Sequence, residues 1–405
     1  MSTLPPPTLP TLPGDIDEIV PGVIADRRHL HEHPELGFQE TETAAFVAQR
    51  LETLGAEDIR TGIAKTGITA LVRGTKPGPD KCVMLRADMD ALPIDEEVDT
   101  DYASKNPGVM HACGHDAHTA MLLGAARILM DRRDQFSGTV KLLFQPSEEA
   151  NGGGAMPMIA AGVLEDPHVD ACFGQHLMSP IPTGYLAVAG GPIQASADTF
   201  KVIVQGKGGH GAMPHQAVDP IMVAADIISG LRTIVARNID PLDPVVVSVC
   251  FIHSGKASNV IPDTAELGGT VRTFSDENRD LAEQRLRQIA EGVAAAQGAS
   301  VSIEYVRGYP PTINDHDMAA LAAESLTRVV GEENVLPMRP IMPGEDMSYF
   351  LNERPGAYFM TGCGNEARGI VWPHHHPKFD LDEEALGIGV AALVQTALDY
   401  LATEA

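Results

Sequence analysis

Two short apolar runs, each followed at once by acidic side chains, constrain the fold of this chain more than any other feature. The first run, residues 81–86, leads directly into Asp88. The second run, residues 138–144, leads into the adjacent pair Glu148 and Glu149. Runs of this length, rich in branched apolar residues and bounded by glycine or proline, predict strands that are buried on both faces.

Helical patterns alternate with these strands and determine the class of fold. Apolar residues recur at helical spacing over residues 15–30, 41–54 and 116–130. Alternating helices and strands predict an α/β catalytic domain with a central, largely parallel sheet. Ligands of such sheets bind beyond the carboxyl ends of the strands, which is where the acidic side chains stand. We therefore expect these side chains to form part of a binding or catalytic site.

A different order of elements follows, and it predicts a second domain. Strands and helices occur in the order β-α-β-β-α-β, which is typical of an α+β ferredoxin-like domain with four antiparallel strands and two helices on one face. Glycines and prolines flank this region, and a chain of 405 residues usually has more than one hydrophobic core. We expect a mobile N-terminal extension (1–14), a metal-binding catalytic domain (15–191 and 309–405) and an inserted lid or dimerisation domain (192–308).

The charge and cysteine content exclude several classes of partner. The chain has 55 acidic and 29 basic residues, for a net charge of −26, so it repels phosphate backbones and anionic lipids. The N-terminus has no signal-peptide pattern, and no apolar run reaches the roughly 18 residues of a membrane span. The five cysteines are odd in number and scattered, unlike a secreted disulfide framework. We expect no nucleic-acid partner, no membrane partner and a cytoplasmic location.

A thiol and three imidazoles lie within residues 111–118, and they are the densest group of potential metal ligands. Cys113 and His115 belong to the residue types that bind borderline and soft divalent metals. The alternative for this cluster is a buried core cysteine beside surface histidines. The adjacent Glu148 and Glu149 could place one carboxylate on a metal and the other on a water. An exposed charged loop is the alternative for that pair.

Two further histidine sites complete the pattern. His176 follows an apolar stretch, and residues 374–376 are three consecutive histidines between prolines. A single histidine at a strand end, such as His176, is more often structural than a metal ligand, and a surface loop is the alternative for the three consecutive histidines. Together, Cys, Glu and His from separate strand ends favour one metal site over several coincidences.

The inserted domain carries its own polar groups. Residues 206–211 surround His210 with glycines, which allow close approach to a ligand but lack the spacing of a phosphate loop. Asn259 and Arg272 add an amide and a guanidinium. Arginine suits bidentate recognition of a carboxylate, and a surface ion pair is the alternative.

The order of these motifs resembles the N-acyl-amino-acid amidohydrolase, or hippurate hydrolase, family of binuclear metallopeptidases, which includes auxin-conjugate hydrolases. The resemblance extends over nearly everything from Arg27 onward. The motifs that carry it, at the spacing of the family, are RHLHEHPE (28–35), RADMDALP (86–93), MHACGHD (110–116), QPSEE (145–149), GKGGHG (206–211) and GEDM (344–347).

The resemblance implies two divalent metal ions in each subunit. Cys113 would bridge them, with His115 and His176 on one ion and Glu149 and His375 on the other. Either neighbour of His375 could substitute for it in the histidine run. This ligand set suits Zn, Mn, Co or Ni.

The resemblance also implies how the remaining residues act. Glu148 would be the general base, and His210 would reach across a homodimer, or a dimer-based tetramer, to stabilise the oxyanion in the partner's site. Asn259 and Arg272 would hold the α-carboxylate of the substrate. An arginine precedes Asp88 where peptidase relatives have a histidine, so Asp88 is expected to support catalysis without binding a metal. The implied reaction is hydrolysis of N-acyl or N-aroyl L-amino acids to a carboxylic acid and a free amino acid.

Two other functions fit the same residues. A metal-independent cysteine hydrolase would use Cys113 as nucleophile and His115 as base. A catalytically silent metal-binding scaffold would keep the ligands but would not need Glu148 or His210. Metal removal separates the first alternative from the metal-dependent amidohydrolase.

Overall fold

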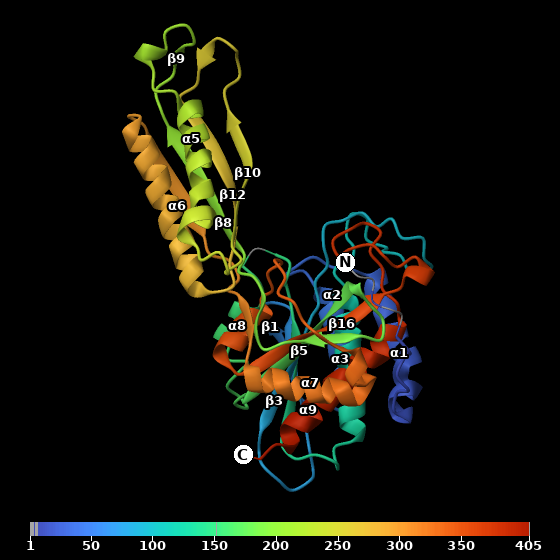
Figure 1. Cartoon of the computed structure of the whole chain (residues 1–405). Helices are drawn as coiled ribbons and strands as arrows, with labels where there is room; N and C mark the ends of the chain where they lie inside the picture. The colour runs from blue at the N-terminus through green and yellow to red at the C-terminus, as the bar shows by residue number, and fades with distance from the viewer. Residues whose placement is uncertain (1–3, 5–6, 151, 405) are drawn as a thin grey trace. The chain divides into compact units, whose positions relative to one another are not determined.

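A computed structural model describes residues 4, 7–150 and 152–404, and the chain divides into two compact units (Figure 1). Unit 1 comprises residues 1–191, 313–339 and 349–405, and unit 2 comprises residues 192–312 and 340–348. Unit 2 thus contains the segment predicted as an insertion and a second short segment that the sequence did not indicate. The extension predicted at residues 1–14 falls partly outside the described residues, and Leu12 of its described part packs against the core of unit 1.

The sheet of unit 1 confirms the predicted fold class. In the described part of the chain its eight strands lie in the order β1 (Glu57–Ile63), β2 (Gly67–Arg73), β4 (Thr139–Gln145), β3 (Cys82–Asp88), β5 (Ala171–Pro182), β16 (Gly356–Gly364), β6 (Leu186–Val188) and β15 (Val335–Pro337). The central strands β4, β3, β5 and β16 are parallel. The outer pairs β1–β2, β2–β4 and β16–β6 are antiparallel. The sheet is therefore mixed, with a parallel centre.

The two strands predicted from apolar runs are β3 and β4. Every residue of both strands is buried, since helices and loops cover both faces of the central sheet. The sequence did not indicate β1, because this edge strand is polar and half-exposed. It also did not indicate β6 and β15, which are only three residues long.

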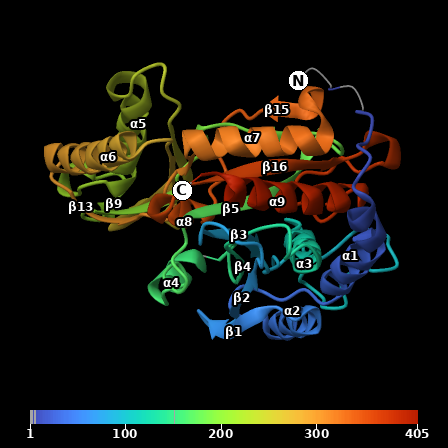
Figure 2. The same cartoon turned by 90° about the horizontal axis from the view of Figure 1, so that it is seen from below.

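A row of helices covers the parallel strands. The helices of unit 1 are α1 (Gly14–Glu32), α2 (Thr41–Leu54), α3 (His115–Asp131), α4 (Ala155–Ala160), α7 (His316–Val330) and α9 (Glu384–Ala402). Helices α2, α3, α9 and α7 contact one another in that order, and Figure 2 shows α7 and α9 side by side. Helix α2 ends at Leu54, as predicted, and Gly55 follows it in the left-handed conformation, which glycine adopts without strain.

Helix α9 is long and apolar enough to cross a membrane by length and composition. However, 78% of it is buried inside the protein. Its contacts with α3, α7 and the strands are those of a core helix. We found no other such helix among the described residues.

Unit 2 has the predicted ferredoxin-like order. Its elements are β8 (Asp198–Gln205), α5 (Pro220–Thr233), β10 (Val246–Ser254), β12 (Thr264–Arg272), α6 (Asp276–Ala296) and β13 (Ser300–Val306). The strands form an antiparallel sheet in the order β10-β12-β8-β13. Helices α5 and α6 lie side by side against it (Figure 1). Helix α5 changes after Thr233 into a π-helical turn at Ile234–Asn238.

Shorter elements complete the chain. In unit 2, β9 (Gly209–His210) pairs with β11 (Val260–Ile261), and a 3-10 turn occupies Pro214–Gln216. The remaining short elements are β7 (Gly191–Gln194), β14 (Thr312–Asn314), α8 (Met347–Glu353) and 3-10 turns at Glu332–Asn334 and Glu366–Arg368.

Candidate metal centre

The predicted metal ligands lie at the carboxyl ends of the four parallel strands of unit 1. Glu148 and Glu149 follow β4, and the loop after β16 carries His375. Strand β3 pairs with β5 as far as Gly174, so His176 lies two residues beyond the last pair. Parallel strands bring their carboxyl ends to one edge of a sheet, and this topology gathers residues that are far apart in the sequence.

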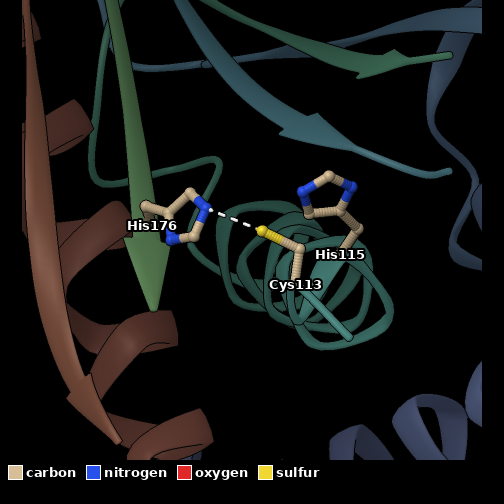
Figure 3. A group of neighbouring side chains, drawn as sticks. All are labelled: Cys113, His115 and His176. Atoms are coloured by element: carbon tan, nitrogen blue, oxygen red, sulfur yellow. Dashed lines mark hydrogen bonds between the residues drawn. The ribbon is translucent and has the colours of Figure 1, made fainter. Parts of the chain in front are cut away.

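The first candidate metal group contains Cys113, His115 and His176. Their ligand atoms lie within 4.8 Å of one another, and all three residues are buried. The Cys113 Sγ is 3.5 Å from the His176 Nε2, and Figure 3 shows the sulfur directed at that imidazole with His115 beside it. Gly114 separates Cys113 from the first residue of α3 and has a φ of +87°, a conformation that glycine adopts without strain.

The second candidate group shares Cys113 with the first. It contains Cys113, Glu149 and His375, again with ligand atoms within 4.8 Å of one another. The His375 Nε2 is 3.0 Å from a Glu149 carboxylate oxygen. His375 has a φ of +64°, which is uncommon for a residue with a side chain, and its N–H donates to the Ala112 carbonyl at 2.8 Å. The thiol therefore lies between two sets of ligands.

The structure distinguishes the three consecutive histidines. His374 is half-buried, and its Nε2 accepts the N–H of Ser179 at 3.4 Å. His376 stacks on Trp372 with ring centroids 4.2 Å apart. Among the described residues, His375 is the member of the run that joins a candidate metal group.

Asp88 contacts other protein side chains of the site. Its carboxylate accepts from the Arg86 guanidinium at 2.7 Å and from the His118 Nδ1 at 2.6 Å. The other nitrogen of His118 accepts the N–H of Leu177, so both ring nitrogens of His118 are used within the protein. The Asp88 carboxylate also lies 3.7 Å from the His115 Nε2. This network orients the imidazoles around Cys113.

The hydrogen bonding of the two ring nitrogens of His115 shows whether this residue could bind a metal. Its Nδ1 is 2.9 Å from the Asp90 carbonyl and 3.2 Å from the Asp90 carboxylate, so it carries the proton and donates. Its Nε2 is buried and has no hydrogen-bond partner among the described residues. Buried polar atoms are seldom unpaired, and a histidine whose second nitrogen bonds a carboxylate is typical of a metal ligand. The donors therefore fit a divalent cation.

The electrostatics of the site also favour a cation. Burial, together with Glu149 and Glu148, raises the pKa of the Cys113 thiol well above its usual value. Burial lowers the pKa of His115, but the neighbouring Asp88 and other acids outweigh it and raise that pKa to about 10. Positive charge is thus stabilised here, and the thiol ionises readily only when a cation is bound to it.

The site residues of unit 2 lie at two different places. His210 in β9 pairs with Val260 of β11, and Asn259 immediately precedes that strand. Arg272 is at the far end of β12, where its guanidinium is half-buried and donates to the Ser196 carbonyl at 3.5 Å. Strand β12 begins at Thr264, a few residues after Asn259, and its rise places Thr264 and Arg272 about 25 Å apart. The structure thus brings His210 and Asn259 together and separates Arg272 from them.

Three residues of the site were given no individual role in the sequence interpretation: Asp90, Glu40 and His118, which was only counted in the cluster at residues 111–118. Asp90 is two residues after Asp88, and His118 is one helical turn after His115, so their spacing was a usable signal. Glu40 had no signal, because it acts on a distant turn through the tertiary fold. Its carboxylate accepts the N–H of Ser147, next to Glu148.

Comparison with known proteins gives consistent matches. The family model described as "Peptidase family M20/M25/M40" matches residues 84–399. Thermostable carboxypeptidase 1 of Saccharolobus solfataricus is 42% identical over 96% of this chain and 98% of its own. N-acyl-L-amino acid amidohydrolase of Geobacillus stearothermophilus is 48% identical over 74% of this chain and 80% of its own. A Bacillus subtilis protein, described as a dinuclear metal-binding peptidase of the M20 family, superimposes with a TM-score of 0.83 at 37% identity, covering 96% of this chain and 100% of its own.

Proposed function

Because this chain belongs to peptidase family M20/M25/M40, and is therefore a metal-dependent amidohydrolase, we propose that it hydrolyses the amide bond of N-acyl or N-aroyl L-amino acids. The products are a carboxylic acid and a free amino acid. One observation carries the proposal: two groups of potential metal ligands share the buried Cys113 at the carboxyl ends of parallel strands. The 48% identity to an N-acyl-L-amino acid amidohydrolase supports the substrate class.

Two divalent cations would be held by the five ligands. Cys113 would be shared by both cations, His115 and His176 would complete one position, and Glu149 and His375 would complete the other. Bound there, the ions polarise the scissile carbonyl and lower the pKa of the attacking water. Thiolate, imidazole and carboxylate together suit Zn, Mn, Co or Ni.

Glu148 is the general base in this proposal. Its carboxylate is 7% exposed and belongs to a group with His115 and Glu149 whose ligand atoms lie within 4.8 Å. Glu148 accepts a proton from the water as its oxygen attacks the carbonyl carbon, and it then gives that proton to the leaving amine as the C–N bond breaks. Asp88 acts through His115 and His118 and is a positioning residue.

Unit 2 acts as a lid and dimerisation domain in a homodimer or a dimer-based tetramer. The reason is the length of β12, which extends about 25 Å from Thr264, its end nearer in sequence to Asn259, to Arg272. One substrate carboxylate would not reach both residues of one subunit, so His210 and Asn259 would act in the site of a second copy. His210 then stabilises the oxyanion. All five cysteines are free thiols, which supports a reducing compartment such as the cytoplasm.

A cysteine hydrolase fits the geometry less well. A nucleophilic cysteine needs a cationic neighbour that lowers its pKa. His115, whose pKa is raised, provides such a neighbour, but burial and the carboxylates of Glu149 and Glu148 still hold the pKa of the Cys113 thiol well above its usual value. A silent scaffold would not require the buried Glu148 beside the ligands.

Carboxypeptidase activity is a second candidate, because the chain is 42% identical to a thermostable carboxypeptidase over nearly its whole length. Both reactions release an amino acid from an amide. A comparison of kcat/KM for N-acetyl and N-benzoyl amino acids with kcat/KM for dipeptides of the same C-terminal residue separates the two candidates. Faster hydrolysis of the dipeptides would favour the carboxypeptidase.

Site variants, assayed with and without added metal, test the chemistry. Glu148→Gln should keep both ions but lose roughly 10²–10⁴-fold in kcat, while Cys113→Ala should lose metal. Cys250→Ala is the matched control, because that cysteine is exposed on unit 2. Activity that survives complete metal removal but is lost on thiol alkylation would overturn the proposal in favour of the cysteine hydrolase.

A further inference from the structure

Three consecutive backbone N–H groups after β4 are held by two buried carboxylates. The N–H of Ser147 donates to Glu40 Oε1 at 2.8 Å. The N–H groups of Glu148 and Glu149 donate to the two oxygens of Asp90, both at 2.9 Å. We call Glu40 and Asp90 the carboxylate clamp. The clamp thus contacts the main chain of the base and of its neighbouring ligand.

The two clamp residues come from separate parts of unit 1. Asp90 follows β3, and Glu40 immediately precedes α2. Both are almost completely buried, at 1% and 0% exposed. Each has a second attachment, since Asp90 accepts from the His115 Nδ1 and Glu40 accepts the Thr66 hydroxyl at 2.6 Å. Asp90 therefore connects the turn after β4 with a predicted metal ligand.

The turn needs this external support because its conformation is unfavourable. Ser147 has a φ of +55°, a left-handed conformation that residues with side chains seldom adopt. Gly37 packs so closely on it that a Cβ at Gly37 would lie 2.6 Å from the Ser147 hydroxyl. A left-handed residue immediately before Glu148 determines the direction in which the next two side chains leave the main chain. Without acceptors for their N–H groups, these residues would relax toward ordinary dihedral angles.

We propose that Glu40 and Asp90 are positioning residues that set the directions of the Glu148 and Glu149 side chains. The proposal rests on the roles proposed above for those two glutamates. Hydrogen bonds from N–H groups to an ionised carboxylate are short and strong, so two on Asp90 hold both peptide planes at once. Asparagine cannot replace Asp90, because its NH2 would face one of the two N–H donors.

Glu40 differs from Asp90 in what can replace it. Glutamine at position 40 keeps an oxygen for the N–H of Ser147, and its NH2 can donate to the Thr66 hydroxyl. Glu40→Gln should therefore stay near the wild type, whereas Glu40→Ala should not. A role in filling space alone would not separate Asp90→Asn from Glu40→Gln, because both changes preserve volume.

The experiment measures Zn²⁺ affinity of the metal-stripped full chain by calorimetry, together with kcat, KM and melting temperature. Asp90→Asn and Glu40→Ala should weaken Zn²⁺ binding about 10–100-fold, as expected for partners of metal ligands, and should lower kcat more than they raise KM. The control is Asp315→Ala, which removes a carboxylate that accepts two N–H groups at 2.9 Å at the start of α7. That variant should lose stability but keep the Zn²⁺ affinity of the wild type.

Wild-type Zn²⁺ affinity and kcat in Asp90→Asn would overturn the proposal, as would equal losses in Glu40→Gln and Glu40→Ala. If Asp90→Asn does not fold, the comparison of the two Glu40 variants decides the question. The proposed function fails separately, because in that case the wild type itself would bind no Zn²⁺ or hydrolyse no N-acyl amino acid.

Discussion

Alanine at Gly389 of α9 should destabilise unit 1, and alanine at Gly22 of α1 should stabilise it. A Cβ at Gly389 would lie 2.1 Å from the Met121 Sδ and 3.0 Å from the side-chain amide of Gln175. A Cβ at Gly22 would meet nothing within 4 Å among the described residues. The same substitution of glycine by alanine can thus be made in two α-helices of one unit, at a crowded position (Gly389) and at an open one (Gly22).

The expected magnitudes follow from two opposing effects. Alanine in a helix interior is more stable than glycine by about 0.8–1.0 kcal/mol, and Gly22→Ala should gain that amount. At Gly389 the same gain is offset by overpacking, which costs about 1–3 kcal/mol. The sulfur of Met121 is in the middle of a fully buried side chain and cannot move aside freely, so the upper end applies. We expect Gly389→Ala to be destabilised by about 2 kcal/mol.

Differential scanning calorimetry of the metal-stripped chain measures both effects. For a unit of this size, 1 kcal/mol corresponds to about 2 °C, so the melting temperature should fall by about 4 °C in Gly389→Ala and rise by about 2 °C in Gly22→Ala. Gln175 donates to the Gly389 carbonyl at 3.2 Å and precedes His176, so Gly389→Ala should also weaken metal binding. Shifts of the same sign and size in both variants would show that the close contact at Gly389 has no energetic effect.

Three further predictions concern the metal site and its surroundings. His375→Ala should lose about one of the two proposed ions by elemental analysis, whereas His376→Ala should keep both, because the His376 ring stacks on Trp372. Arg27→Met should lower the free energy of unfolding in urea by about 3–5 kcal/mol, since it leaves the fully buried Asp116 without its cation at 2.9 Å. Removal of metal by a chelator should lower the melting temperature, and added metal at 100 times its Kd should restore about 2.7 kcal/mol.

The sequence predicted those helices and strands in which the burial of the residues follows one regular pattern from end to end. Strands β3 and β4 were recognisable because burial on both faces makes every residue apolar or internally paired. The end of α2 was recognisable because Gly55 takes a left-handed conformation that other residues avoid. Strand β1 was not, since an edge strand exposed to solvent can carry almost any polar residue. The second segment of unit 2 has no local signal, because it joins that unit only through tertiary contacts.

The candidate site divides in the same way. Cys113 and Glu149 could be proposed as ligands from the sequence because metal ligands need particular residue types at strand ends. The choice among three histidines depended on the backbone of His375, whose φ of +64° cannot be deduced from neighbouring residues. The role of Asp90 could not be deduced from the sequence either, because Asp90 accepts main-chain N–H groups and these are present at almost every residue. A sequence therefore indicates which side chains can bind a metal, but it does not indicate which side chains form hydrogen bonds with the main chain.

The shared position of Cys113 has a consequence for how the proposed centre fills. Burial and the surrounding acids keep its thiol protonated, and one thiol has one proton to lose. The first cation to bind would bear the free energy of displacing that proton, and the second would meet a thiolate already formed. The two positions would therefore be linked, and the thiol proton would be released in the first binding step.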